Sequence, residues 1–378
     1  MPKTPLAVYV HWPYCARICP YCDFNVYKQR EDNALLPAIL RDLQYWRDIS
    51  GSRDVRSVHF GGGTPSLMSP QQLSAILEQV DKLWGLQDAE IALEANPHEA
   101  REDDWRGYQQ AGLTRLSLGV QSFDDTGLKF LGRDHDSKQA QKAVDLALRL
   151  FSSVSADLIF GWQGQTQDVL AHDVNSLIEA GIHHISTYQL TIEVGTAFEK
   201  AESRGQARTV DSDLSADYYE WVRDRLIESG FDHYEVSNFA RANHRSHHNL
   251  AYWQGHDYVG VGPGAHGRLT IDAQKRATIA HMRPELYAKA VKETGCGIDT
   301  FETLSDQSRA EEYLLMGLRI DEGISLSQYE SYASEPMNRT EVAALVKEGL
   351  LYLEKDRLMA TGQGRLVLNA VTERLLLS

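Results

Sequence analysis

The 378-residue sequence lacks the features that would place it in a membrane or on a nucleic acid. It has no apolar run of about 18 residues, and its N-terminus carries no apolar signal-peptide core. No long block of Lys or Arg occurs, and 38 basic against 53 acidic residues give a net charge of −15. The electrostatic footprint of a phosphate-backbone binder is therefore missing. We predict a cytoplasmic protein with no nucleic-acid partner.

The chain also lacks low-complexity linkers and internal repeats. Hydrophobic residues make up 42% and charged residues 24%, which is typical of a folded protein and excludes a disordered chain. At roughly 150 residues per domain, this length predicts two to three domains.

Cysteine is scarce, and its distribution is uneven. Of four cysteines, Cys15, Cys19 and Cys22 fall within eight residues, while Cys296 stands alone. Tight spacing in a large chain without a secretory signal indicates metal or redox chemistry rather than a disulfide framework. Three thiolates suit a [4Fe–4S] cluster with one iron left open. The alternative is a structural zinc site that takes a distant histidine as its fourth ligand, for which His11 is the nearest candidate.

The periodicity of the first half alternates between strands and helices. Short apolar or β-branched runs predict strands at 6–11, 55–60, 90–94, 114–118, 154–160 and 184–190. Amphipathic stretches predict helices near 34–49, 70–84, 99–111, 137–151 and 168–180. Crossovers of this length join parallel strands, so we expect an α/β fold built as a partial (β/α)6 barrel, with ligands at the carboxyl ends of the strands.

The rhythm changes after about residue 205. We predict a barrel at 1–205, an extension at 206–280 with a helix at 212–229 and a strand at 231–237, and a C-terminal winged-helix-like domain at 281–378. The last domain has predicted helices at 307–319, 326–333 and 340–349, followed by apolar runs at 350–354 and 357–360. Its third helix holds a single Lys, so a DNA-reading role is disfavoured.

The segment HWPYCARICPYCDF around the three cysteines resembles the radical S-adenosylmethionine (SAM) superfamily. This resemblance implies that Cys15, Cys19 and Cys22 hold a [4Fe–4S] cluster whose open iron is chelated by SAM. It also implies that one electron from the cluster cleaves the sulfonium of SAM. The superfamily core is a (β/α)6 barrel, in agreement with the element count.

Polar motifs follow the predicted strands at the same edge of the barrel. They are GGGTPS from Gly61, Glu94 before Asn96-Pro97, Gln121 after strand four, Arg133 in LGRDH, and Asp157 inside an apolar strand. An acid in such a strand needs a donor nearby. Together these stretches resemble the coproporphyrinogen dehydrogenase branch of the superfamily. That resemblance assigns these residues to the SAM pocket: Tyr9, Tyr21, Gly62, Gly63, Thr64, Glu94, Gln121, Arg133 and Asp157.

Three further features resemble the haem chaperones of the HemW type. Phe24 stands where the dehydrogenases have a further cysteine, and little chain precedes Tyr9 where they carry a longer N-terminal segment. The stretch His248, Asn249, Tyr252 and Trp253 matches the H-N-x-x-Y-W motif of that family. Imidazole can ligate haem iron and aromatic rings can cover a porphyrin, although the same residues could be a structural histidine and core anchors.

The resemblance therefore implies a haem chaperone that binds a [4Fe–4S] cluster, SAM and haem or another porphyrin. Its partners would be an electron donor and recipient haemoproteins, including membrane proteins. The alternative is an oxygen-independent coproporphyrinogen III dehydrogenase, which decarboxylates propionates in haem biosynthesis. A third reading is a radical SAM enzyme acting on an unrelated substrate.

Overall fold

The computed structural model describes residues 4–30 and 32–377. Within them, six parallel strands form the centre of a large sheet and lie side by side in chain order. They are β1 (Pro5–Trp12), β4 (Asp54–Gly62), β5 (Glu90–Ala95), β6 (Arg115–Gln121), β7 (Ser153–Phe160) and β8 (His184–Gln189). The six predicted strands are thus confirmed.

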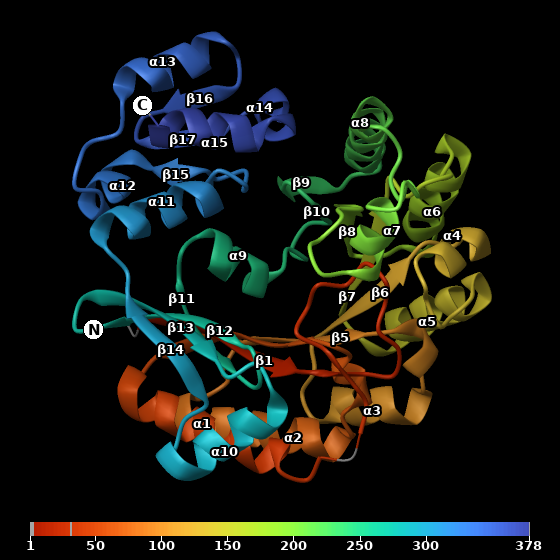
Figure 1. The fold of residues 1–378 in the computed structure, drawn as a ribbon, viewed down its shortest axis with the longest axis vertical. Coiled ribbons are helices and arrows are strands. Elements are labelled where there is room, and N and C mark those ends of the chain that lie inside the picture. The colour runs from red at the N-terminus through yellow and green to blue at the C-terminus, as the bar shows by residue number, and fades with distance from the viewer. Residues whose placement is uncertain (1–3, 31, 378) are drawn as a thin grey trace.

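Helices connect these strands, and most of them pack on one face of the sheet (Figure 1). They are α1 (Leu35–Ser50), α2 (Pro70–Trp84), α3 (Glu102–Gln110), α4 (Asp125–Phe130), α5 (Ser137–Leu150) and α6 (Gln167–Ala180). Local chemistry sets their ends. The side chains of Ser69 and Asp136 form capping boxes at the starts of α2 and α5, and α6 ends at Gly181 in the left-handed conformation.

The two faces of the central sheet differ in polarity because side chains alternate along each strand. One set, which includes Val58, Phe60, Leu93, Leu116 and Leu118, is buried in the apolar core beneath the helices. The opposite set is largely polar: Tyr9, Ser57, His59, Glu90, Glu94, Arg115, Ser117, Gln121, Ser155, Asp157, His184 and Ser186. The polar face is the one available to a ligand.

Further strands extend this sheet at both edges. Beyond β1 lie β11 (Asp257–Val261), β12 (His266–Ile271), β13 (Gln274–Ala280) and β14 (Ile298–Thr303), and beyond β8 lie β10 (Asn238–Ala240) and β9 (Asp232–Glu235). The associated helices are α7 (Ala197–Glu202), α8 (Ser212–Glu228), α9 (His247–Trp253) and α10 (Pro284–Thr294). We predicted a C-terminal unit from residue 281, and β14 in that range pairs with β13 in the large sheet.

The C-terminal residues have a core of their own, gathered from Ala310 onward. They form α11 (Asp306–Gly317), β15 (Ile324–Ser325), α12 (Leu326–Tyr332), α13 (Arg339–Lys347), β16 (Leu351–Glu354), β17 (Arg357–Ala360), α14 (Gly362–Leu366) and α15 (Leu368–Leu377). Helices beside a small antiparallel sheet give the expected winged-helix-like arrangement. Helix α9 lies between this unit and the large sheet (Figure 1). A search of the described helices finds none with the length and apolarity to span a bilayer.

Candidate functional site

A cavity of about 410 Å³ lies where the parallel strands end. It collects the predicted residues from distant parts of the chain: Cys15, Cys19, Tyr21, Cys22, Gly62, Gly63, Thr64, Glu94, Gln121, Arg133 and Asp157 all line it. Tyr9 lies behind this wall, where its hydroxyl hydrogen-bonds His11 Nδ1 at 3.0 Å. Carboxyl ends of parallel strands are the usual place for ligands in such folds.

The cysteine loop is held at the mouth of this cavity. A short parallel pair, β2 (Tyr14–Cys15) with β3 (Tyr27–Lys28), closes the base of the loop. Cys22 N donates to Cys19 O at 3.2 Å. Burial raises the pKa of the Cys22 thiol to about 11, so metal binding to it would release a proton. The described residues contain no group of three or more His, Cys, Asp or Glu side chains already gathered around one metal position.

Both ring nitrogens of His11 are engaged by other protein groups. Its ring hydrogen-bonds Tyr9 Oη through Nδ1 and Asn25 O through Nε2, at 3.0 and 2.9 Å. With both ring nitrogens occupied, His11 is a poor candidate for the fourth ligand of a zinc site.

At the glycine turn where β4 ends, neighbouring protein groups leave no room for a side chain. Gly62 has φ +110°, and a Cβ there would lie 2.5 Å from the ring of His11. A Cβ on Gly63 would lie 2.7 Å from Tyr14 O. Glycine therefore lets the turn pack tightly against β1 and the base of the cysteine loop while its backbone lines the cavity.

The carboxylate of Glu94 is oriented by two donors. His59 Nε2 lies 2.9 Å from Glu94 Oε1, and Gly62 N donates to Glu94 Oε2 at 3.3 Å. The side chain remains 39% exposed and lines the cavity. The remaining lone pairs can therefore accept hydrogen bonds from ligand hydroxyls.

Arg133 links the cysteine loop to the strand ends. Its Nη1 donates to Cys19 Sγ and to Tyr21 Oη, each at 3.3 Å, and its Nη2 donates to Gly119 O at 3.1 Å and to Asn96 Oδ1. Two buried polar atoms of this group, Arg133 Nε and Gln121 Oε1, have no hydrogen-bond partner within residues 4–30 and 32–377. Both residues line the cavity, and buried polar atoms without a partner are uncommon in folded proteins and mark a place where a polar ligand or water can bind.

Asp157 lies deeper on the same face. Burial, opposed by a hydrogen bond from Ser186, raises the pKa of its carboxyl to about 7. Ser186 is the donor that we expected an acid in this strand to need.

The residues of the H-N-x-x-Y-W motif lie apart from the cavity. His248 is 2% exposed, and its Nδ1 and Nε2 hydrogen-bond Ser57 Oγ at 3.0 Å and Tyr252 Oη at 3.1 Å. Arg319 stacks on the ring of Trp253, 4.7 Å from its centroid. Asn249 N donates to the cap residue Ser246. In this structure neither nitrogen of His248 is free to ligate a metal.

The sequence analysis missed several residues of this site. Asn96 and Tyr188 line the cavity, and His59 holds Glu94. The signal for His59 was present, because it shares the two-residue period of Ser57 and Gly61 on β4 and therefore their face. Asn96 was visible as the residue between a strand end and a proline.

Comparisons with known proteins identify the fold and the superfamily. A model of the radical SAM superfamily matches residues 9–177, and one of the HemN C-terminal domain matches residues 304–367. Coproporphyrinogen III oxidase (HemN) from Escherichia coli, described as a radical SAM enzyme, superposes with a TM-score of 0.82 at 21% identity. The match covers 99% of this chain and 91% of the other. Fold and site together define a radical SAM protein.

Relatives that align over nearly the whole chain show which family of radical SAM proteins it belongs to. A heme chaperone HemW from Mycobacterium tuberculosis is 35% identical, covering 100% of this chain and 96% of its own. The Haemophilus influenzae HemW is 33% identical, covering 99% and 98%. The mitochondrial radical S-adenosyl methionine domain-containing protein 1 of Bos taurus is 39% identical, covering 98% and 87%. The chain therefore belongs to the HemW family of the radical SAM superfamily.

Proposed function

We propose that this protein binds a [4Fe–4S] cluster, SAM and haem, and delivers the haem to recipient haemoproteins. The observation that carries the proposal is that three thiols and the predicted SAM-binding groups line one cavity. The names of the HemW relatives support the chaperone part.

The donor set fits the cluster and SAM. Cys15, Cys19 and Cys22 supply three soft thiolate ligands, which leaves one iron open. The free lone pairs of Glu94 suit the hydroxyls of a ribose, and Gln121 and Arg133 line the same cavity. When bound, the cluster would supply the electron for cleavage of SAM.

That haem binds at His248, Asn249, Tyr252 and Trp253 stays a prediction. Ligation by His248 would require one ring nitrogen to lose its hydrogen bond, to Ser57 or to Tyr252, and the buried ring to become accessible. The electron donor, the recipient haemoproteins and the cytoplasmic location also stay predictions.

The test is anaerobic reconstitution of the full chain, followed by haem titration and incubation with coproporphyrinogen III, SAM and a reductant. We expect about four iron atoms per chain, a haem Soret band, and no formation of vinyl groups from propionates. Transfer is then measured as loss of haem from this protein to an apo-haemoprotein acceptor.

The main alternative makes the opposite prediction. Turnover of coproporphyrinogen III would overturn the chaperone proposal in favour of the dehydrogenase. Failure of both haem binding and porphyrinogen turnover would instead favour a radical SAM enzyme with an unrelated substrate.

A further inference from the structure

His59, which holds Glu94, is itself backed by a second histidine. The ring of His248 stacks on that of His59, with centroids 4.6 Å apart and an interplanar angle of 12°. Tyr9 flanks the pair, with its ring centroid 6.1 Å from each histidine. A continuous chain of contacts therefore runs from α9, through β4, to the carboxylate in the cavity.

Hydrogen bonds fix the ring of His248 in the plane that this stacking needs. Ser57 on β4 hydrogen-bonds His248 Nδ1, and Tyr252 on the next turn of α9 hydrogen-bonds His248 Nε2. Burial and the neighbouring His59 lower the pKa of His248 well below its usual value.

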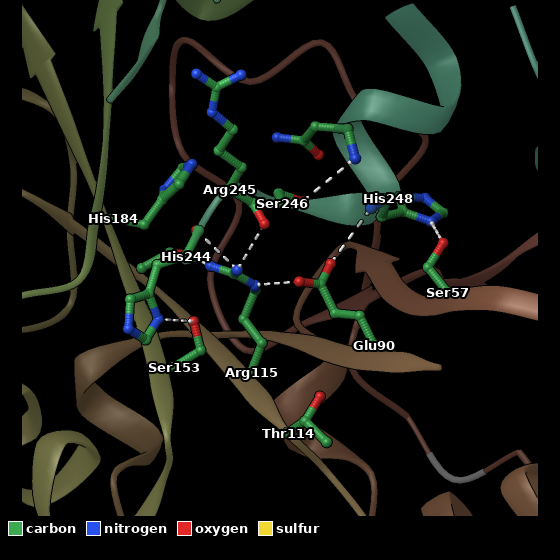
Figure 2. A network of polar contacts seen from close by, with 12 residues as sticks. Ser57, Glu90, Thr114, Arg115, Ser153, His184, His244, Arg245, Ser246 and His248 are labelled. Atoms are coloured by element: carbon green, nitrogen blue, oxygen red, sulfur yellow. Dashed lines mark hydrogen bonds and ion pairs between the residues drawn. The ribbon is translucent and has the colours of Figure 1, made fainter. Parts of the chain in front are cut away.

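The segment that carries His248 is anchored at the starts of β5 and β6, the opposite end of these strands from the cavity. Figure 2 shows the contacts of this anchor. Glu90, at the start of β5, accepts from His248 N at 3.3 Å and from Arg115 Nε at 2.8 Å. Arg115 Nη2 donates to the carbonyl oxygens of His244 and Arg245, at 2.9 and 3.1 Å. The Arg115–Glu90 pair is nearly inaccessible to water, so the anchor is a buried ion pair.

The same segment contains a second histidine with matching local contacts. His244 Nδ1 hydrogen-bonds Ser153 Oγ at 3.1 Å, and its ring stacks on His183 with centroids 4.4 Å apart. Figure 2 shows His244 at Ser153 and His248 at Ser57, on opposite sides of Arg115. His244 does not contact the residues that hold Glu94, whereas His248 stacks on one of them.

From this arrangement we propose that His248 is a positioning residue for the SAM site, acting through His59 on Glu94. The ring of His248 restricts the ring of His59 to one orientation, and His59 then holds Glu94 Oε1. The remaining lone pairs of the Glu94 carboxylate then point into the cavity before SAM arrives. Because the side chain is already ordered, SAM binding costs little of its conformational entropy. The inference rests on SAM binding at this cavity, as proposed above.

The experiment compares His248→Leu with His244→Leu in the full-length, reconstituted protein. We expect the Kd for SAM to rise about tenfold in His248→Leu, as is common when a partner that orients a ligand-binding group is lost. We expect no more than about a twofold change in His244→Leu, although that variant also loses a hydrogen bond to a strand serine and a ring stack. If His248→Leu folds poorly, His248→Phe keeps a ring for stacking and should retain SAM affinity better than the leucine variant.

A second measurement does not depend on SAM. The ring 15N signals of His59 should shift in Glu94→Gln and in His248→Leu, and stay unchanged in His244→Leu. If the wild-type protein does not bind SAM, the proposed function fails while this spectrum still decides the positioning role.

Two results would overturn the inference. One is an unchanged SAM Kd in His248→Leu when the wild type binds SAM. The other is a ring 15N signal of His59 that is unchanged in His248→Leu. In the first case, a change in the haem spectrum of His248→Leu would assign His248 to the haem site.

Discussion

The two ends of the parallel strands carry similar polar side chains, yet use them differently. At the amino end, Arg115 and Glu90 are 4% and 9% exposed, and their charged groups are paired with each other and with the 244–248 segment. At the carboxyl end, Arg133 Nε and Gln121 Oε1 are buried without a partner, and Glu94 faces the cavity.

This difference separates a structural polar network from a binding site. A buried charge that is fully paired fixes one arrangement of the chain, whereas unpaired groups around a cavity retain their capacity for a ligand. The predictions below change one end at a time.

The largest effect is expected at the carboxyl end. Cys19→Ala should abolish the brown [4Fe–4S] absorbance after anaerobic reconstitution, because two remaining thiolates cannot hold the cluster. Cys296→Ala is the control, since Cys296 lies near Thr294 Oγ1 on another part of the chain, and it should keep full iron content. Equal iron content in the two variants would show that the ligand set is wrong.

At the amino end, Arg115→Ala should lower the free energy of unfolding by about 3–5 kcal/mol, because it leaves Glu90 as an unpaired buried charge. Chemical denaturation measures this. Arg106→Ala removes an exposed pair with Glu102 on α3 and should cost no more than about 0.5 kcal/mol. Similar losses in both variants would contradict the view that the amino end is a structural network.

Asp173 is a buried acid close to the point where β6 ends, and unlike Glu90 it has no basic side chain among its hydrogen-bond donors in the part of the chain that the structure describes. Asp173 on α6 is 1% exposed and accepts from Phe123 N and Ser122 Oγ. Burial raises its pKa from 3.8 to about 7. The pKa of Asp173 is higher in the folded protein than in the unfolded chain. The stabilisation from its protonated carboxyl is therefore fully present below about pH 4 and is lost as the pH rises to about 7.

Asp173→Asn should therefore flatten the pH dependence of stability between about pH 4 and 7, by about 2–4 kcal/mol in total. Urea unfolding of both proteins across this range measures the change. Parallel pH profiles for the variant and the wild type would mean that Asp173 does not carry this titration.

The smallest effect concerns the link between the amino-end network and the C-terminal unit. Arg245 makes a bidentate pair with Asp321, at 3.1 and 2.7 Å, and both side chains are about one-third exposed. A double-mutant cycle with Arg245→Ala and Asp321→Ala should give a coupling energy of about 0.5–1 kcal/mol. A coupling above about 3 kcal/mol would place this pair with the buried network instead.

Much of the site could be predicted because the signals were local. The C-x3-C-x2-C spacing and the residues at strand ends needed only the chain order and the rule that parallel strands end at one edge. His59 was missed because its role depends on Glu94, 35 residues away, and on the pleat that turns both toward the same face.

The sequence alone determined the strands, the connecting helices and the cysteine spacing, since each depends on residues within a few turns of one another. Only the tertiary structure decided that His248 lies buried with both ring nitrogens engaged, while the three thiols share a cavity with Glu94. The reason is physical: burial and hydrogen-bond saturation arise when segments nearly 200 residues apart, such as Ser57 and His248, meet across the sheet.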